Sequence, residues 1–228
     1  MYVPWADLLP DIEVVLVHLP GRDKRIREPL HERLLPLVDE LAEALLPHLD
    51  KPYAFFGHSM GGLVSFEVAR RLRKMNTRQP SHLFISARRP PHKDDPHKNI
   101  YRLSDRDFIR LTEYLYGALP DLVRQDPEVL RLFLNIMRAD FRMLGTYQYT
   151  AEPPLEYPIS VYGGLDDKSV NEEVLKGWAE QTTSTFHLKM YPSDHFFIQN
   201  SRAAVLQELN RTLSNGAAQK LPQISEGL

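Results

Sequence analysis

Residues 53–62 of the chain have the sequence YAFFGHSMGG, in which a serine stands between two glycines in the pattern G-x-S-x-G. A short apolar run precedes the serine, and Val64, Val68 and Leu72 recur every four residues after it, as on one face of a helix. We expect Gly57 and Gly61 to be required because side chains there would collide with the strand and the helix. The segment predicts a nucleophile elbow; a glycine turn before a helix by chance is the alternative.

Outward from this segment, apolar runs alternate with amphipathic ones. Strands are predicted at residues 12–18 (IEVVLVH), 53–56, 82–86, 159–162 and 185–191. Helices are predicted at about 61–74, 170–181 and 203–213, and earlier along the stripe of Leu37, Leu41 and Leu45, with Pro36 in the first turn. This alternation predicts an α/β fold with a mainly parallel sheet and helices on both faces. Residues 90–158 interrupt it with helical patterns at 108–115 and 129–144, which predicts a helical lid over the edge of the sheet or over its carboxyl end, where ligands bind. We expect one domain over residues 1–215 and a flexible tail over 216–228.

Composition and charge exclude several classes of function. The chain has 43% hydrophobic and 25% charged residues, as expected for a globular domain. Its 28 basic and 30 acidic residues provide no net positive field for a nucleic acid or an anionic membrane. It has no cysteine, so thiolate zinc sites and cysteine nucleophiles are excluded. We find no metal-ligand or dinucleotide motif, signal peptide or apolar run of about 18 residues, and therefore expect a cytoplasmic protein without a cofactor.

A serine on an elbow needs a base, and His195 is the best candidate among the histidines. It lies in YPSDHFF (residues 191–197), just after the last predicted strand, where a loop can return its imidazole toward Ser59. An ordinary loop histidine is the alternative. We expect His187 and His18 to be packing or capping residues, because they lie within or at the end of strands. His58 leaves the elbow in another direction from Ser59 and is a poor base.

The acid that orients the base is predicted in YGGLDDKSV, residues 162–170, after the fourth predicted strand. The order serine, acid, histidine is typical of α/β-hydrolases. We favour Asp167 over Asp166, because Asp166 could serve as a turn or helix-capping residue; the same capping role is the alternative for Asp167. The backbone N–H of Met60, at the start of the helix after the serine, is the predicted oxyanion donor.

Taken together, five motifs resemble those of the type II thioesterases: GHSMGG, LPGR at 19–22, MRADFRML at 137–144 with Thr146-Tyr147 after it, GGLDD at 163–167 and SDHFF at 193–197. These enzymes are stand-alone α/β-hydrolases that accompany nonribosomal peptide and polyketide synthetases, and the resemblance covers about residues 3–213. It implies that Ser59 is the nucleophile, His195 the base and Asp167 the acid. The expected reaction is hydrolysis of misplaced short acyl groups from the phosphopantetheine thiol of a carrier protein, by a monomer.

One feature departs from that family. Its members begin with a further strand that ends in an H-A-G-G-like turn and supplies the second oxyanion donor, whereas this sequence opens at a segment that follows the turn in those proteins. The resemblance therefore leaves two expectations open, a translation start further upstream or a relative with impaired chemistry. Two other interpretations are an esterase or acyltransferase for soluble small molecules and a silent remnant that only binds carriers.

Two further patterns each allow a functional and a structural interpretation. The basic cluster formed by Arg70, Arg71, Arg73, Lys74 and Arg78 could dock an acidic carrier, or could simply favour the carboxyl end of its helix. The apolar stripes of the lid could line an acyl channel or pack the lid itself. These stripes consist of Phe108, Leu111 and Leu115, and of Phe133, Met137, Phe141 and Leu144.

Overall fold

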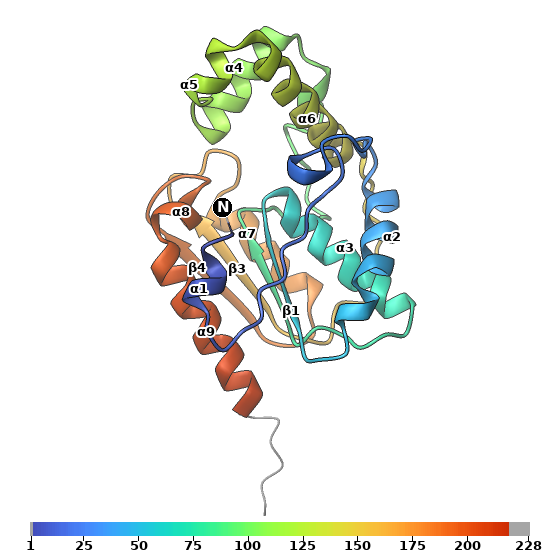
Figure 1. Cartoon of the computed structure of the whole chain (residues 1–228). Helices are drawn as coiled ribbons and strands as arrows, with labels where there is room; N and C mark the ends of the chain where they lie inside the picture. The colour runs from blue at the N-terminus through green and yellow to red at the C-terminus, as the bar shows by residue number, and fades with distance from the viewer. Residues whose placement is uncertain (1, 219–228) are drawn as a thin grey trace, which may run out of the picture. The chain divides into compact units, whose positions relative to one another are not determined.

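A computed structural model describes residues 2–218 of the chain (Figure 1). The chain divides into two compact units. The larger unit is His18–Phe196, and the smaller one is formed by the residues before and after it. The larger unit holds every strand of the sheet and every residue predicted to take part in catalysis.

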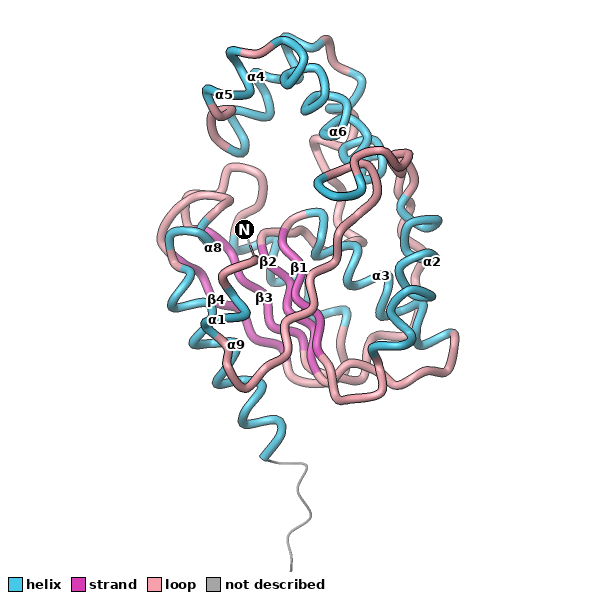
Figure 2. The backbone as a smooth tube through the Cα atoms, viewed as in Figure 1, coloured by secondary structure: helices cyan, strands magenta, loops and turns pink. Residues whose placement is uncertain are grey.

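Four parallel strands form the sheet of the larger unit (Figure 2). They are β1 (Ala54–His58), β2 (His82–Ser86), β3 (Ile159–Gly164) and β4 (Phe186–Tyr191), paired in that order. In the register of the sheet, Gly57 lies opposite Ile85, and Ile85 lies opposite Val161. Parallel neighbours need crossover connections, and helices occupy each of them. The predicted parallel α/β sheet is confirmed.

The helices of the larger unit lie before and between these strands. Those that pack beside the sheet are α2 (Leu34–Leu45), α3 (Met60–Lys74) and α7 (Glu172–Lys176). The lid, residues 90–158, contains α4 (Asp105–Tyr116), α5 (Asp121–Gln125) and α6 (Pro127–Thr146). Short 3-10 turns occur at Asp23–Arg25, Leu46–His48, Ile100–Arg102 and Gly177–Gln181.

Alternating side chains of β2 and β3 build the core on one face of the sheet. The contributing residues are Leu83, Ile85, Ile159 and Val161 from the strands, Phe66 and Ala69 from α3, and Leu175 and Trp178 from the segment after β3. All of them are buried. A second cluster joins α2 to α3 through residues such as Leu37, Leu41, Val64 and Leu72. Helix α3 belongs to both clusters, so the helix after the elbow is fixed on two sides.

The lid has a small apolar core of its own. Phe108 and Leu115 of α4 are buried with Ile100 and Leu134, and Leu111, Met137 and Phe141 pack against them. This arrangement accounts for most of the predicted apolar stripes as internal packing of the lid, rather than as the lining of an acyl channel.

An ion pair attaches the lid to the loop that carries the LPGR motif. Arg22 Nη1 and Nη2 donate to Asp140 Oδ2 and Oδ1 of α6 at 3.0 and 2.9 Å, and the two residues are 118 positions apart. Burial raises the pKa of Asp140, which the contact with Arg22 opposes. Two parallel hydrogen bonds fix orientation as well as distance, which makes this contact more specific than a single surface ion pair.

Basic residues at the end of α3 form ion pairs with carboxylates of the same unit. Arg70 is 3% exposed; its Nη1 lies 2.6 Å from Glu67 Oε1 and its Nη2 lies 2.5 Å from Glu152 Oε1. Arg73 and Lys74 also pair with Glu152, at 3.1 and 2.7 Å. Arg70 is therefore a buried structural residue and cannot dock a carrier.

The predicted strand at residues 12–18 is wrong. These residues pair with no strand in the described sheet, and Val15 and Val17 are 52% and 51% exposed. An apolar run forms a strand only where a neighbouring edge accepts its hydrogen bonds, and its sequence cannot show whether that edge is present.

The smaller unit contains α1 (Trp5–Leu8), α8 (Phe197–Asn200) and α9 (Arg202–Ala218). Helix α9 is longer than predicted, so residues 216–218 of the expected tail are helical; the rest of that tail lies outside the described residues. Among the helices described, none is long and apolar enough to cross a membrane.

The turn between β1 and α3 is tight at one of its two glycines and open at the other. Ser59 has φ 53° and ψ −119°, a conformation that non-glycine residues rarely adopt. A Cβ at Gly57 would lie 2.1 Å from the carbonyl oxygen of Gly61, whereas a Cβ at Gly61 would meet nothing within 4 Å. The expected collision is real at Gly57, but the expectation for Gly61 is wrong.

This difference predicts opposite outcomes for two alanine substitutions. Gly57→Ala should lower the free energy of unfolding by about 2 kcal/mol or more, because backbone atoms must move to relieve the overlap. Gly61→Ala, in the first turn of α3, should leave it within about 1 kcal/mol of the parent value. Urea denaturation followed by circular dichroism measures both. Equal losses for the two variants would contradict the asymmetry.

Candidate active site

The elbow places Ser59 between the carboxyl end of β1 and the amino end of α3. Its backbone N–H donates to the carbonyl oxygen of Ser86 on β2 at 2.7 Å, which fixes the turn to the sheet. Met60 is the first residue of α3, so its N–H has no acceptor within the helix. The positive end of the helix dipole and this N–H are both suited to stabilise a developing oxyanion beside the serine.

Asp167 and His195 form a direct, buried contact. The Nδ1 of His195 lies 2.8 Å from Asp167 Oδ2. The side chain of Asp167 is 0% exposed and that of His195 is 3% exposed. Asp167 lies on the acid loop (residues 165–171) between β3 and α7, and His195 follows β4. With Nδ1 held by the carboxylate, Nε2 is the nitrogen that can accept a proton. The pair therefore has the arrangement that an acid and base need.

Hydrogen bonds keep the buried carboxylate of Asp167 ionised. Its Oδ1 accepts from the backbone N–H and the hydroxyl of Ser169 at 2.8 and 2.7 Å, and from the N–H of Val170 at 3.3 Å. Burial alone would raise the pKa of Asp167, but the bonds from His195 and Ser169 outweigh it and hold the pKa below the ordinary value. The carboxylate thus combines the turn-capping role with the contact to His195.

The structure separates the two neighbouring aspartates. Asp166 is exposed, and its backbone N–H donates to the carbonyl oxygen of Ser193 at 3.0 Å. Asp167 is buried and faces His195. The turn after β3 therefore directs one carboxylate to the imidazole and leaves the other on the surface.

The other candidate histidines lie in different environments. The Nδ1 of His58 lies 2.9 Å from Ser86 Oγ, and burial lowers the pKa of His58 to about 3, because an imidazolium is poorly solvated there. His58 is thus a neutral residue that packs beside the site. His187 is exposed on β4 and His18 is exposed 3.7 Å from Asp23, so neither is packed, and the capping role stays a prediction for both.

The imidazole of His195 lies beside that of His58, the residue before Ser59. The ring centroids of His58 and His195 are 4.9 Å apart, which brings the imidazole beside the elbow. Within residues 2–218, the structure contains no hydrogen bond between Ser59 Oγ and His195 Nε2. Such bonds are often long in ligand-free enzymes and tighten when substrate binds.

Two further residues lie against this pair and were not predicted. Ser169 bonds Asp167 and places its Oγ 3.1 Å from His195 Nδ1. Tyr116, at the end of α4, has its ring centroid 4.7 Å from that of His195. Ser169 could have been suspected from its position two residues after the acid. Tyr116 could not, because its sequence position does not show where the lid contacts the loops.

In the part of the chain that the structure describes, no group of three histidine, aspartate or glutamate side chains is arranged to hold a metal ion.

Comparisons with known proteins agree with this arrangement. The model of the thioesterase domain family matches residues 1–213. The gramicidin S biosynthesis protein GrsT of Aneurinibacillus migulanus is 38% identical over 221 residues, which cover 96% of this chain and 86% of that protein.

Solved structures are similar over most of their length as well. The RedJ thioesterase from the prodiginine biosynthetic pathway in Streptomyces coelicolor is 34% identical with a TM-score of 0.85, and the match covers 92% of this chain and 79% of RedJ. The type II thioesterase BorB from the borrelidin biosynthetic cluster is 31% identical with a TM-score of 0.79, and the match covers 92% of this chain and 83% of BorB. A parallel sheet with a serine elbow, a buried acid–imidazole pair and these matches lead to one conclusion: the chain belongs to the thioesterase domain family.

Proposed function

We propose that the protein hydrolyses acyl thioesters on the phosphopantetheine thiol of carrier proteins, and that it clears misplaced short acyl groups during nonribosomal peptide or polyketide synthesis. The observation that carries this proposal is the buried 2.8 Å contact between His195 and Asp167 beside the elbow of Ser59. The carrier as partner is supported by similarity to the gramicidin S biosynthesis protein GrsT and to the type II thioesterase BorB from the borrelidin biosynthetic cluster.

In the first half of the proposed reaction, Ser59 Oγ attacks the thioester carbonyl while His195 Nε2 accepts its proton. Asp167 holds the imidazole in the tautomer whose Nε2 is free to do so, and stabilises the imidazolium that forms. The Met60 N–H donates to the oxygen of the tetrahedral intermediate. When the C–S bond breaks, the proton on His195 passes to the departing thiolate, and the acyl group remains on Ser59.

In the second half, water replaces the thiol. His195 Nε2 takes a proton from the water as it attacks the acyl carbonyl, and then returns that proton to Ser59 Oγ as the ester bond breaks. The products are a free carboxylic acid and the regenerated enzyme. Ser59 and His195 thus act in both halves of the reaction, and His195 carries the proton in each.

An esterase for soluble small molecules would use the same residues. The preferred substrate distinguishes that function from hydrolysis of carrier-bound thioesters. A silent carrier-binding remnant is disfavoured by the ionised, fully hydrogen-bonded state of Asp167. The monomeric state and the cytoplasmic location remain predictions from the sequence.

The serine and carrier assignments can be tested together. A carrier protein bearing acetyl-phosphopantetheine should lose its acetyl group in the presence of the parent protein, and Ser59→Ala should reduce the rate by about 10⁴-fold or more, because alanine has no oxygen to carry the acyl group. Intact-mass spectrometry of the carrier measures the loss directly.

The competing functions give different results in the same assay series. Acetyl-coenzyme A and a p-nitrophenyl acetate ester are the comparison substrates, and kcat/KM should be about tenfold or more higher for the carrier. A preference for the ester would favour the esterase function. Acetyl release that survives in Ser59→Ala would exclude the serine mechanism.

The acid assignment gives a second prediction. Asp167→Asn should lower kcat by roughly 10³–10⁴-fold at neutral pH, because an amide can stabilise the wrong imidazole tautomer and cannot balance the imidazolium. Asp166→Asn is the matched control, since it makes the same change on the exposed neighbour, and it should retain activity within about twofold. A large loss of kcat in Asp166→Asn and a small one in Asp167→Asn would identify Asp166 as the acid.

The lowered pKa of Asp167 also predicts how stability depends on pH. A group whose pKa is lower in the folded state stabilises the protein above the pKa of the unfolded state, and this contribution is lost as pH falls through the folded pKa. The difference in free energy of unfolding between the parent protein and Asp167→Asn should therefore shrink as pH falls from about 5 to about 3. Urea titrations at each pH measure it. A difference that grows toward acid would show that the pKa is raised instead.

A further inference from the structure

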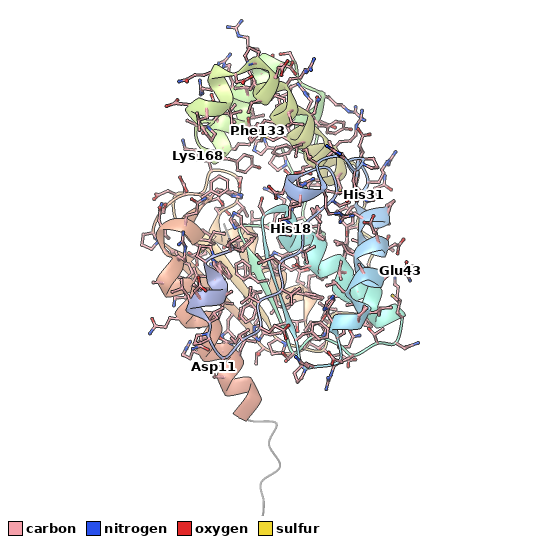
Figure 3. All side chains as sticks on the ribbon, in the orientation of Figure 1. Asp11, His18, His31, Glu43, Phe133 and Lys168 are labelled. Atoms are coloured by element: carbon pink, nitrogen blue, oxygen red, sulfur yellow. The ribbon has the colours of Figure 1, made fainter. Side chains whose placement is uncertain are left out.

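A groove lies where the lid meets the segment before α2. One part of it has a volume of about 530 Å³, and an adjoining part of about 360 Å³ is lined by several of the same residues. Figure 3 shows His31, two residues before Arg33, at the junction of α2 and the lid. We call the two parts together the junction groove; its charged residues are Glu32, Arg33, Lys98, Arg102 and Arg142.

Positive charge dominates the junction groove. Its four basic side chains are exposed, and its one carboxylate, that of Glu32, lies 2.6 Å from Arg142 Nη1. Within residues 2–218, the side chains of Arg33, Lys98 and Arg102 form no ion pair; the Nε of Arg102 donates to the hydroxyl of a neighbouring tyrosine at 2.9 Å. The whole chain has a net charge of −2, so the groove is a local positive site on a weakly acidic protein.

The basic cluster at the end of α3 has a different charge balance. Arg71 Nε lies 2.7 Å from Asp39 Oδ1. Arg73 and Lys74 share the carboxylate of Glu152, at 3.1 and 2.7 Å. A cation that already lies beside a carboxylate attracts an approaching anion less than an unpaired cation does, because the field of the carboxylate opposes its own. Of these two basic regions, the junction groove is therefore the better site for an anionic partner.

We propose that the junction groove is the surface on which the protein docks an acidic carrier. The proposal rests on the proposed function, because it takes the carrier from there. A carrier presents its acyl group at the end of a long, flexible phosphopantetheine arm, so the docking surface need not adjoin Ser59. Charges at such a surface act mainly on the rate of association and on the salt dependence of binding.

Tyr101 helps to order the cations of the groove before a partner arrives. Its ring centroid lies 5.3 Å from the guanidinium carbon of Arg102 and 5.8 Å from that of Arg142. The backbone of Tyr101 is itself held, because its carbonyl oxygen accepts from Arg138 Nη1 at 2.7 Å. Side chains that are already ordered lose less conformational entropy on binding, which favours a specific complex. Since Arg33 precedes α2 and Arg142 lies on α6, a docked carrier contacts the core and the lid together.

A nucleic acid is the other polyanion that such a groove could attract. Sites for single strands combine an extended basic surface with aromatic rings on which the bases stack. Here the ring of Tyr101 is already contacted by two guanidinium groups, and the positive charge is confined to one junction of a chain with net charge −2. These observations favour a folded acidic protein, and a single-stranded oligonucleotide is the comparison ligand.

Binding of a holo-carrier, whose phosphopantetheine thiol bears no acyl group, tests the proposal without turnover. The probe is a fluorescently labelled peptidyl carrier domain of acidic net charge. The test variant combines Arg33→Gln, Lys98→Gln and Arg102→Gln, which removes three charges that have no carboxylate partner. The matched control combines Arg71→Gln, Arg73→Gln and Lys74→Gln, which removes the same charge from the end of α3. Circular dichroism establishes that both variants are folded.

Fluorescence anisotropy should distinguish the two variants. At about 50 mM salt, the Kd of the carrier should be at least about tenfold higher for the test variant than for the parent protein, and within about twofold of the parent value for the control. Raising the salt to about 500 mM should weaken binding to the parent protein about tenfold and binding to the test variant much less, because fewer charges remain to be screened.

The outcomes separate this proposal from the proposed function. Equal Kd values for the three proteins, no measurable binding to the parent protein, or tighter binding of the oligonucleotide than of the carrier would overturn the docking surface. If the carrier binds through the groove but its acetylated form is not hydrolysed, the docking surface stands and the proposed function fails. If the test variant hydrolyses the acetyl-carrier with the kcat/KM of the parent protein, the function stands and the docking surface fails.

Discussion

The parallel pairing of the four strands is the constraint on which the site depends. Because every strand runs in the same direction, the segments that follow β1, β3 and β4 leave the sheet at the same edge. Ser59, Asp167 and His195 each follow one of those strands within a few residues. Residues that are far apart in the sequence therefore lie close together, and no single segment has to carry the whole arrangement.

Burial sets the chemistry of the charged groups that result. Asp167 stays ionised because several donors replace the water it has lost, while burial and the nearby His195 lower the pKa of His58 and keep it neutral. The same physics operates at the far end of α3, where Arg70 is buried but lies between two glutamates. For Asp167 and Arg70, close polar partners keep the charge despite burial, whereas burial keeps His58 neutral.

The sequence predicted those parts of the structure that depend on local pattern. The elbow, the acid and histidine segments and the two long lid helices all fall where their glycines and apolar repeats indicate. The strand expected at residues 12–18 failed because strand formation depends on a partner edge that is distant in sequence. The prediction of a collision at Gly61 was wrong for a related reason. The motif contains two glycines, but only the three-dimensional path of the chain shows that Gly57 is crowded and Gly61 is not. Ser169 and Tyr116 were missed because their importance arises from where the lid meets the acid loop.

The ion pair between Arg22 and Asp140 has a consequence for how the molecule is made. The elbow and the first two strands are encoded close together, whereas this pair closes a loop of 118 positions. During synthesis the amino-terminal part of the larger unit can therefore begin to fold well before Asp140 has emerged from the ribosome. Asp140 nevertheless emerges before β3 and β4, so the lid can be tied to the LPGR loop before the strands that position the acid and the histidine have been made.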